Sequence, residues 1–75
     1  MTDDQINNIF TYHEPFGTQQ ARYEQLRSTA KTLANLINQL CPESNEKNLS
    51  FAYLQSAIQW ANASIAINET VQNYQ

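Results

Sequence analysis

The sequence has few of the features that usually stabilise so short a chain. It contains 75 residues, and a chain of about this length buries only about 60% of the surface that its unfolded form exposes. Cys41 is the only cysteine, so no disulfide can form within the chain. His13 is the only histidine, and one Cys with one His does not make a structural zinc site. Since small domains without these supports often associate with copies of themselves, the composition predicts self-association.

Positive charge and long apolar runs are also scarce. Four Lys and Arg stand against seven Asp and Glu, for a formal net charge of -3, so we expect no binding to long nucleic acid, which calls for a broad basic surface. A small anionic ligand needs only two or three cations and is not excluded. No run of about 18 apolar residues occurs, and the acidic N-terminus lacks the core of a secretory signal. We therefore expect no membrane partner and a location in a reducing cytoplasm.

Two long stretches without glycine or proline predict two long helices. The first is expected over 18–41 with Thr18 as its N-cap, and the second over 44–68 with Ser44 as its N-cap. A short connection at Pro42 makes the pair antiparallel. The fold class is thus an all-α two-helix hairpin, in one domain over 1–75. Apolar residues recur every three or four positions, as in coiled-coil packing, at Tyr23, Leu26, Ala30, Leu33, Ile37 and Leu40, and at Phe51, Leu54, Ile58, Ala61 and Ile65.

The two ends of the chain have weaker patterns. Residues 1–17 form an N-terminal segment, in which Asp3 or Asp4 is expected to cap a short helical turn. The backbone before Pro15 should be extended, because proline excludes the helical region for its predecessor. Residues 69–75 are expected to fray.

A second apolar row on the later helix cannot be covered by the first helix. The row consists of Tyr53, Ala57, Trp60 and Ile67. Its two aromatic side chains carry a large apolar surface, and a patch of this size points to self-association into a homo-oligomer. The alternative is that the N-terminal segment folds back over the row. We favour self-association, because it also answers the stability problem of a short chain.

Catalytic chemistry has little support in the sequence. Cys41 is placed at a helix C-terminus, where the helix dipole opposes a thiolate, so a packed or hinge cysteine is expected. The carboxylates are scattered near helix ends and turns, and Gly17, the only glycine, makes no phosphate-binding loop. We expect no enzyme, no catalytic residue, no metal site and no cofactor.

The cations are more informative, because three of the four lie on the first half of the first helix. Arg27 and Lys31 are four positions apart and therefore neighbours on one face, and Arg22 is the third of these cations. Cations for phosphates and rings for bases together suit a nucleotide. The alternative is a solvated charged face beside an apolar cluster, which composition alone favours. The rings upstream that would complete a site belong to Phe10, Tyr12, His13 and Phe16.

Several short segments occur in an order and spacing that resemble a known phage family. They are Phe10-Thr11-Tyr12-His13-Glu14-Pro15, Arg22-Tyr23, Leu26-Arg27, Leu33-Ala34, Leu40-Cys41-Pro42-Glu43-Ser44 and Trp60-Ala61-Asn62-Ala63-Ser64-Ile65-Ala66. Over about residues 9–68 the chain resembles the helical-hairpin family of anti-CBASS nucleotide sponges, which defeat a bacterial cyclic-oligonucleotide immune system.

The resemblance implies a compact homohexamer that acts in the host bacterial cytoplasm. Its ligands would be cyclic dinucleotides of the 3′,3′-cGAMP-like type, bound between protomers and sequestered without cleavage. Tyr12 matches the family's base-stacking tyrosine, and Arg27, fifteen positions later, matches its phosphate-binding cation. Lys31 is assigned as a helper from helical geometry alone.

A second family site, for cyclic trinucleotides, is matched only in part. Thr29 fits its threonine, whereas Asn68 lies in the segment where the family has an arginine. Strong cyclic trinucleotide binding is therefore not expected. The role of Arg22, either toward ligand or in an ion pair with a neighbour's carboxylate, stays open. The alternative function is a helical adaptor that binds a protein through its Tyr53/Trp60 face.

Overall fold

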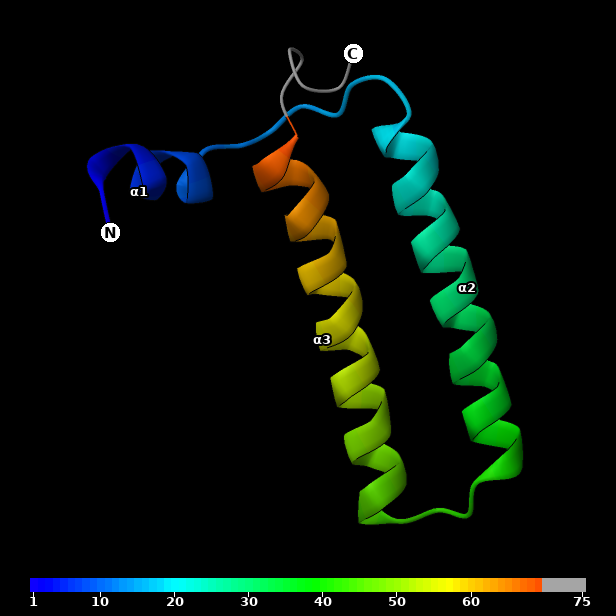
Figure 1. Cartoon of the computed structure of the whole chain (residues 1–75). Coiled ribbons are helices and arrows are strands. Elements are labelled where there is room, and N and C mark those ends of the chain that lie inside the picture. Colours follow the sequence, from blue (N-terminus) through cyan, green and yellow to red (C-terminus); the bar gives the residue numbers. More distant parts are fainter. Residues whose placement is uncertain (70–75) are drawn as a thin grey trace.

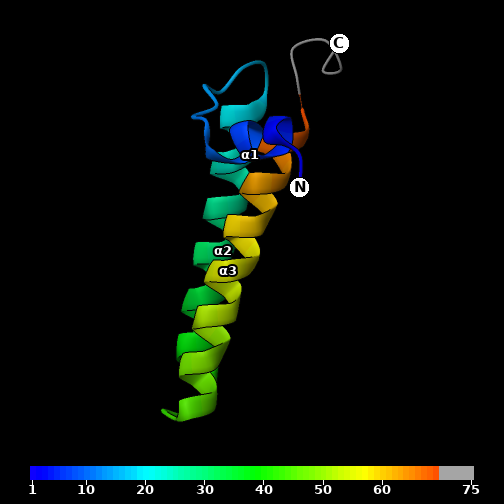
Figure 2. The same ribbon diagram turned by 90° about the vertical axis from the view of Figure 1, so that its left-hand side faces the viewer.

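A computed structural model of the chain describes residues 1–69, which form three helices and no strand. Helix α1 spans Asp3–Phe10, α2 spans Gln19–Leu40 and α3 spans Asn45–Asn68. The two long helices lie side by side and antiparallel, and α1 lies at the C-terminal end of α3 on the side away from α2 (Figure 1, Figure 2). The predicted all-α hairpin is confirmed. None of the three helices is long and apolar enough to span a membrane.

Helix α1 begins with a reciprocal capping box. The backbone N–H of Gln5 donates to Thr2 Oγ1 (3.1 Å), and the backbone N–H of Thr2 donates to Gln5 Oε1 (2.7 Å). The expectation that Asp3 or Asp4 caps this helix is wrong, because the Thr2 hydroxyl takes that position. Both aspartates lie in the first turn, where the helix dipole favours negative charge.

The turn into α2 depends on Gly17. Its φ of 57° lies in the left-handed region, which glycine reaches without the steric cost of a Cβ. Thr18 follows as the N-cap, but its side chain makes no capping bond to the backbone of the helix. Its hydroxyl instead accepts a hydrogen bond from Arg22 Nε (3.2 Å), which fixes the arginine at the start of α2.

The connection between the long helices forms where Cys41 precedes Pro42. Cys41 has an extended backbone (φ -106°, ψ 137°), as expected for a residue before proline. Ser44 caps α3 as predicted, its Oγ accepting from the backbone N–H of Lys47 (3.1 Å). The Cys41 side chain is exposed, so the expectation of a packed cysteine is wrong.

The only side chains fully buried in the described part of the chain are polar. They belong to Gln19 and Lys47, which are 2% and 5% exposed. The Lys47 ammonium donates to the backbone carbonyl of Asn38 (3.1 Å) and to the Glu43 carboxylate. These partners offset the cost of burying an ammonium and join the last turn of α2 to the first turn of α3.

Residues 1–69 contain no fully buried apolar side chain. The molecule measures 46 × 28 × 15 Å, so it is one helix layer thick. Its accessible surface of 6121 Å² exceeds the roughly 4,700 Å² expected of a compact monomer of 8.6 kDa. The hairpin alone therefore leaves much apolar surface uncovered. The larger exposed apolar side chains on α2 and α3 are Leu33, Leu36, Leu40, Leu49, Tyr53 and Trp60.

The N-terminal segment does not fold back over the aromatic residues of α3. Tyr53 and Trp60 are 71% and 75% exposed. Helix α1 meets α3 at its far end, where the side-chain amide of Asn8 donates to the Ile67 carbonyl (3.1 Å). The fold-back alternative is therefore wrong for both aromatic side chains.

The end of α3 is held by contacts across the hairpin. Glu69 is its C-cap, and the Glu69 backbone N–H donates to the Ile65 carbonyl (3.2 Å). Fraying was expected from this residue onward, and for Glu69 that expectation is wrong, because its carboxylate is bonded to Gln19 and Arg22. Residues 70–75 lie outside the described part.

Candidate functional site

Two grooves lie on opposite sides of the α2–α3 pair. At about 100° per residue, positions 27, 31 and 34 of α2 lie on one side of the row that faces α3, and positions 22, 25 and 29 lie on the other. We name them the Arg27 groove and the Arg22 groove. The Arg27 groove is lined by Arg27, Ala30, Lys31, Ala34, Phe51, Leu54, Gln55, Ile58 and Gln59. The Arg22 groove is lined by Arg22, Gln25, Leu26, Thr29 and Ile65.

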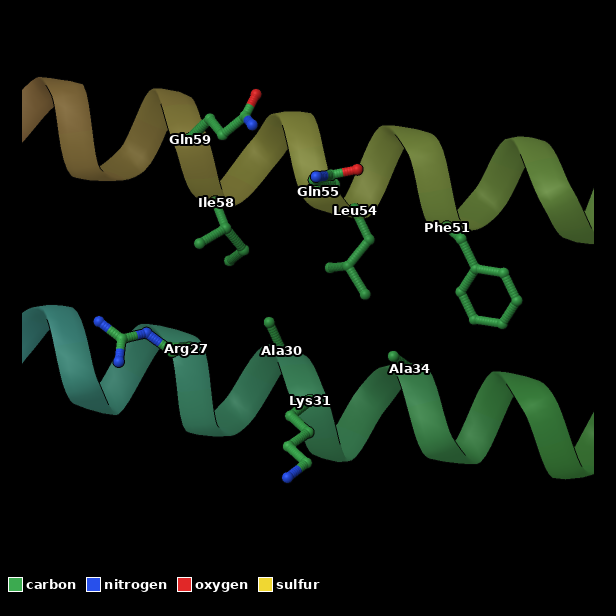
Figure 3. Close-up of a pocket in the computed structure, with 9 residues that line it drawn as sticks. All are labelled: Arg27, Ala30, Lys31, Ala34, Phe51, Leu54, Gln55, Ile58 and Gln59. Atoms are coloured by element: carbon green, nitrogen blue, oxygen red, sulfur yellow. The ribbon is translucent and has the colours of Figure 1, made fainter.

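The floor of the Arg27 groove is apolar. Phe51, Leu54 and Ile58 point from α3 toward α2, where Ala30 and Ala34 present only methyl groups (Figure 3). Because small side chains face large ones, the helices leave a space of about 500 Å³. This volume lies within the range of about 300–1,000 Å³ that is usual for small-molecule sites.

The two rims of the Arg27 groove carry different chemistry. Arg27 and Lys31 supply two cations from α2, and Gln55 and Gln59 supply two amides from α3. The amides can both donate to and accept from a polar ligand edge. A ligand with an anionic part, a polar edge and a flat apolar face matches this arrangement.

The cations of this groove are weakly engaged within the chain. Arg27 bonds to Glu24 (2.9 Å), but the two side chains are 67% and 60% exposed, and such exposed pairs add little stability. Lys31 forms no ion pair with another of the described residues. A ligand phosphate can therefore compete for both cations at small cost.

The arginine of the opposite groove is firmly engaged. Arg22 Nη1 and Nη2 donate to the two carboxylate oxygens of Glu69 (2.7 and 2.5 Å), and Gln19 Nε2 donates to the same carboxylate (3.1 Å). The hydrogen bond from Arg22, followed by that from Gln19, lowers the pKa of Glu69 from 4.5 to about 2. Within one chain, Arg22 pairs with the chain's own carboxylate, a third arrangement beside the two alternatives that the sequence left open.

The predicted residues of the N-terminal segment lie in the stretch of chain that connects α1 to α2, at the open end of the hairpin. Tyr12 is 84% exposed and lines neither groove, so one chain does not bring it to Arg27. His13 Nε2 lies 2.6 Å from the Asn8 carbonyl, and since a carbonyl only accepts, this bond requires a proton on Nε2. Phe16 is half-buried.

The residues predicted for a trinucleotide site are not brought together. Thr29 lines the Arg22 groove. The Asn68 amide donates to the Ser64 carbonyl (2.9 Å), one turn back on its own helix. Asn68 lines a separate hollow beside α1, with Met1, Gln5, Asn8, Ile9 and Ile67.

Three polar residues of α3 were missed by the sequence analysis. Gln55 and Gln59 form the amide rim, and Asn62 lines a hollow that adjoins it through Arg27. Asn62 Oδ1 is buried and has no hydrogen-bond partner among residues 1–69. The available signal was their spacing of four and three, which places all three on one face of α3. Of the residues described, no three His, Cys, Asp or Glu side chains form a group that could hold a metal ion.

The antiparallel pair with its short leading helix defines a helical-hairpin protein. A family model described as the hairpin domain of Acb2/Tad1 matches residues 2–66. The chain therefore belongs to the Acb2/Tad1 hairpin family, which is the anti-CBASS protein 2 family, and the resemblance read from the sequence is confirmed. Neither curated proteins nor solved structures gave a match.

Membership gives the chain its role at the level of the family. The family consists of phage anti-CBASS sponges, which bind cyclic oligonucleotide signals and act inside host cells.

Proposed function

We propose that this chain sequesters a cyclic dinucleotide of the 3′,3′-cGAMP-like type in the Arg27 groove. The observation that carries the proposal is the pair of cations, Arg27 and Lys31, beside an apolar floor of suitable size. The family role as a sponge for cyclic oligonucleotides supports it.

Each part of the ligand has a matching part of the groove. The phosphates lie against Arg27, whose planar fork bonds two phosphate oxygens at once, with Lys31 one turn away as a second charge. The bases lie over the apolar floor, and Gln55 and Gln59 bond their polar edges.

The site is completed by a second protomer of a homo-oligomer, for which the resemblance implies a hexamer. Tyr12 is exposed and does not line the Arg27 groove of its own chain, which leaves its ring available to stack on a base held by a neighbour. The uncovered apolar surface of α2 and α3 supports the same assembly. Two protomers related by a two-fold axis would offer a symmetric pocket to a nearly symmetric ligand.

The ligand is held and not cleaved, so the protein acts as a sink for the signal and not as an enzyme. It acts in the host bacterial cytoplasm. If this is right, ligand released by heating the complex is chemically intact by chromatography. Appearance of linear dinucleotide in that sample would show hydrolysis instead.

Calorimetric titration with a panel of cyclic dinucleotides tests the proposal. The wild-type protein should bind at least one of them at micromolar protein concentration. Tyr12→Ala should weaken binding about 10-fold or more, because stacking on one base contributes about 1–3 kcal/mol. Tyr12→Phe keeps the ring and is the matched control. Absence of heat with every member of the panel would disprove the proposal.

A second candidate function is a helical adaptor that binds a partner protein through Tyr53 and Trp60. The high exposure of both side chains favours it as well. Light scattering on the free protein separates the two candidates. A stable oligomer covers this face with other copies of the chain, whereas a monomer leaves it to a partner.

A further inference from the structure

At the open end of the hairpin, several donors from α2 converge on the carboxylate of Glu69, the residue that follows α3. The start of α2 and the end of α3 lie at the same end of the pair (Figure 1). Arg22 contributes two N–H groups and Gln19 contributes one, and all three reach the Glu69 carboxylate within 3.1 Å. The arrangement has the composition of an anion-binding site.

We infer that Gln19 and Arg22 form a phosphate-binding site that the chain fills with its own Glu69, so that Glu69 determines whether the Arg22 groove accepts an anionic ligand. The phosphodiester of a nucleotide is the ligand class that follows from the proposed function, on which this choice of ligand rests. The site itself follows from the contacts.

The donors are held in place independently of Glu69. Gln19 is 2% exposed, and its side-chain carbonyl accepts from the backbone N–H of Phe16 (3.1 Å), which fixes the direction of its amide. Arg22 is held through its Nε by Thr18 (3.2 Å). Since both donors are oriented by other partners, removal of the carboxylate leaves them pointing at the same place.

A phosphate suits this place at least as well as the carboxylate does. The guanidinium fork bonds two oxygens of either group. The position also lies beside the first turn of α2, where the helix dipole favours negative charge. The remaining part of a ligand would run along Gln25 and Thr29, which line the groove beyond Arg22.

Glu69 competes as part of the same molecule. Tethering at the end of α3 gives the carboxylate a high effective concentration at Arg22, which a free ligand must exceed. Its pKa of about 2 keeps it ionised at neutral pH, so the competition persists there. Within residues 1–69 the Arg27 groove has no comparable competitor, since the Arg27–Glu24 pair is open to solvent.

Titration with inorganic pyrophosphate and with 3′,3′-cGAMP tests this inference. Glu69→Gln should bind pyrophosphate at least 10-fold more tightly than the wild type, and the gain should disappear in Glu69→Gln/Arg22→Ala. The matched control is Glu46→Gln, which removes the same charge from the first turn of α3, at the other end of the hairpin. It should leave pyrophosphate binding unchanged.

The inference is overturned if Glu69→Gln and Glu69→Ala both keep the wild-type helical circular dichroism and both bind pyrophosphate as the wild type does. A gain that survives Arg22→Ala, or that Glu46→Gln reproduces, also overturns it, because the added binding is then elsewhere or reflects net charge. The cyclic dinucleotide arm reports separately on the proposed function. If the wild type does not bind the dinucleotide while Glu69→Gln binds pyrophosphate more tightly, the proposed function is contradicted and the inference about Glu69 stands.

Discussion

The two grooves of the hairpin each contain an arginine from α2, yet the two arginines differ in availability. Among the described residues, the ion-pair partner of Arg27 is Glu24, one turn away and exposed. Arg22 has a carboxylate partner from the end of α3 and shares it with a buried glutamine. The number of cations on a helix therefore does not indicate how many of them can bind a ligand. Whether a cation is available to a ligand depends on partners that are distant in sequence.

Replacement of the available arginine should have the largest effect. Arg27→Ala should weaken cyclic dinucleotide binding about 10- to 100-fold, since hydrogen bonds to charged groups contribute about 1.5–3 kcal/mol. Arg27→Lys keeps the charge but loses the planar fork. Its affinity, measured by calorimetry, should therefore lie between those of the wild type and Arg27→Ala. Equal affinities for the wild type and Arg27→Ala would move the site out of this groove.

A substitution at the closed end of the hairpin, where α2 connects to α3, should lower the stability of the hairpin that carries both grooves. Lys47→Met leaves the Asn38 carbonyl without its donor and should lower the free energy of unfolding by about 1–3 kcal/mol. Urea denaturation measures this change. Lys31→Met is the matched control, because its side chain is exposed and should change stability little. Similar unfolding midpoints for the two variants would show that Lys47 does not stabilise the connection.

A smaller effect should appear as a pH dependence of stability. The pKa of Glu69 is lowered from 4.5 to about 2, so its contribution to stability is fully present above about pH 4.5 and is lost as the pH falls through about 2. Urea midpoints of the wild type and of Glu69→Gln should therefore converge between these pH values. A difference between the two urea midpoints that stays constant from pH 6 to pH 2 would contradict the Arg22–Glu69 bond.

The smallest effect is expected at the engaged arginine. Arg22→Ala should leave cyclic dinucleotide affinity within about 2-fold of the wild type, because this side chain lines the other groove. Calorimetry beside Arg27→Ala makes the comparison direct. A loss as large as that of Arg27→Ala would remove the distinction between the grooves.

Much of the hairpin could be predicted because its signals are local. The apolar rows, Pro42 and Ser44 act on neighbouring residues, and the fold class followed from them. The buried polar residues were missed although they continue the same rows. Gln19 precedes Tyr23 by four positions, and Lys47 precedes Phe51 by four, so each occupies the first inward position of its helix.

The residues around the grooves were harder to predict because they meet across long separations. Glu69 reaches Arg22 across 47 positions, and Asn8 reaches Ile67 across 59, contacts that no local pattern encodes. Tyr12 and Arg27 were predicted as a pair from the family pattern, and whether they meet between protomers stays a prediction.

A crystal structure of the protein soaked with 3′,3′-cGAMP tests the central claim most directly. We predict ligand in the Arg27 groove, its phosphates at Arg27 and Lys31 and a base stacked on the Tyr12 ring of a neighbouring protomer, with the Arg22–Glu69 bond intact. Ligand in the Arg22 groove with Glu69 displaced, or an Arg27 groove filled by another protomer's side chains, would contradict it.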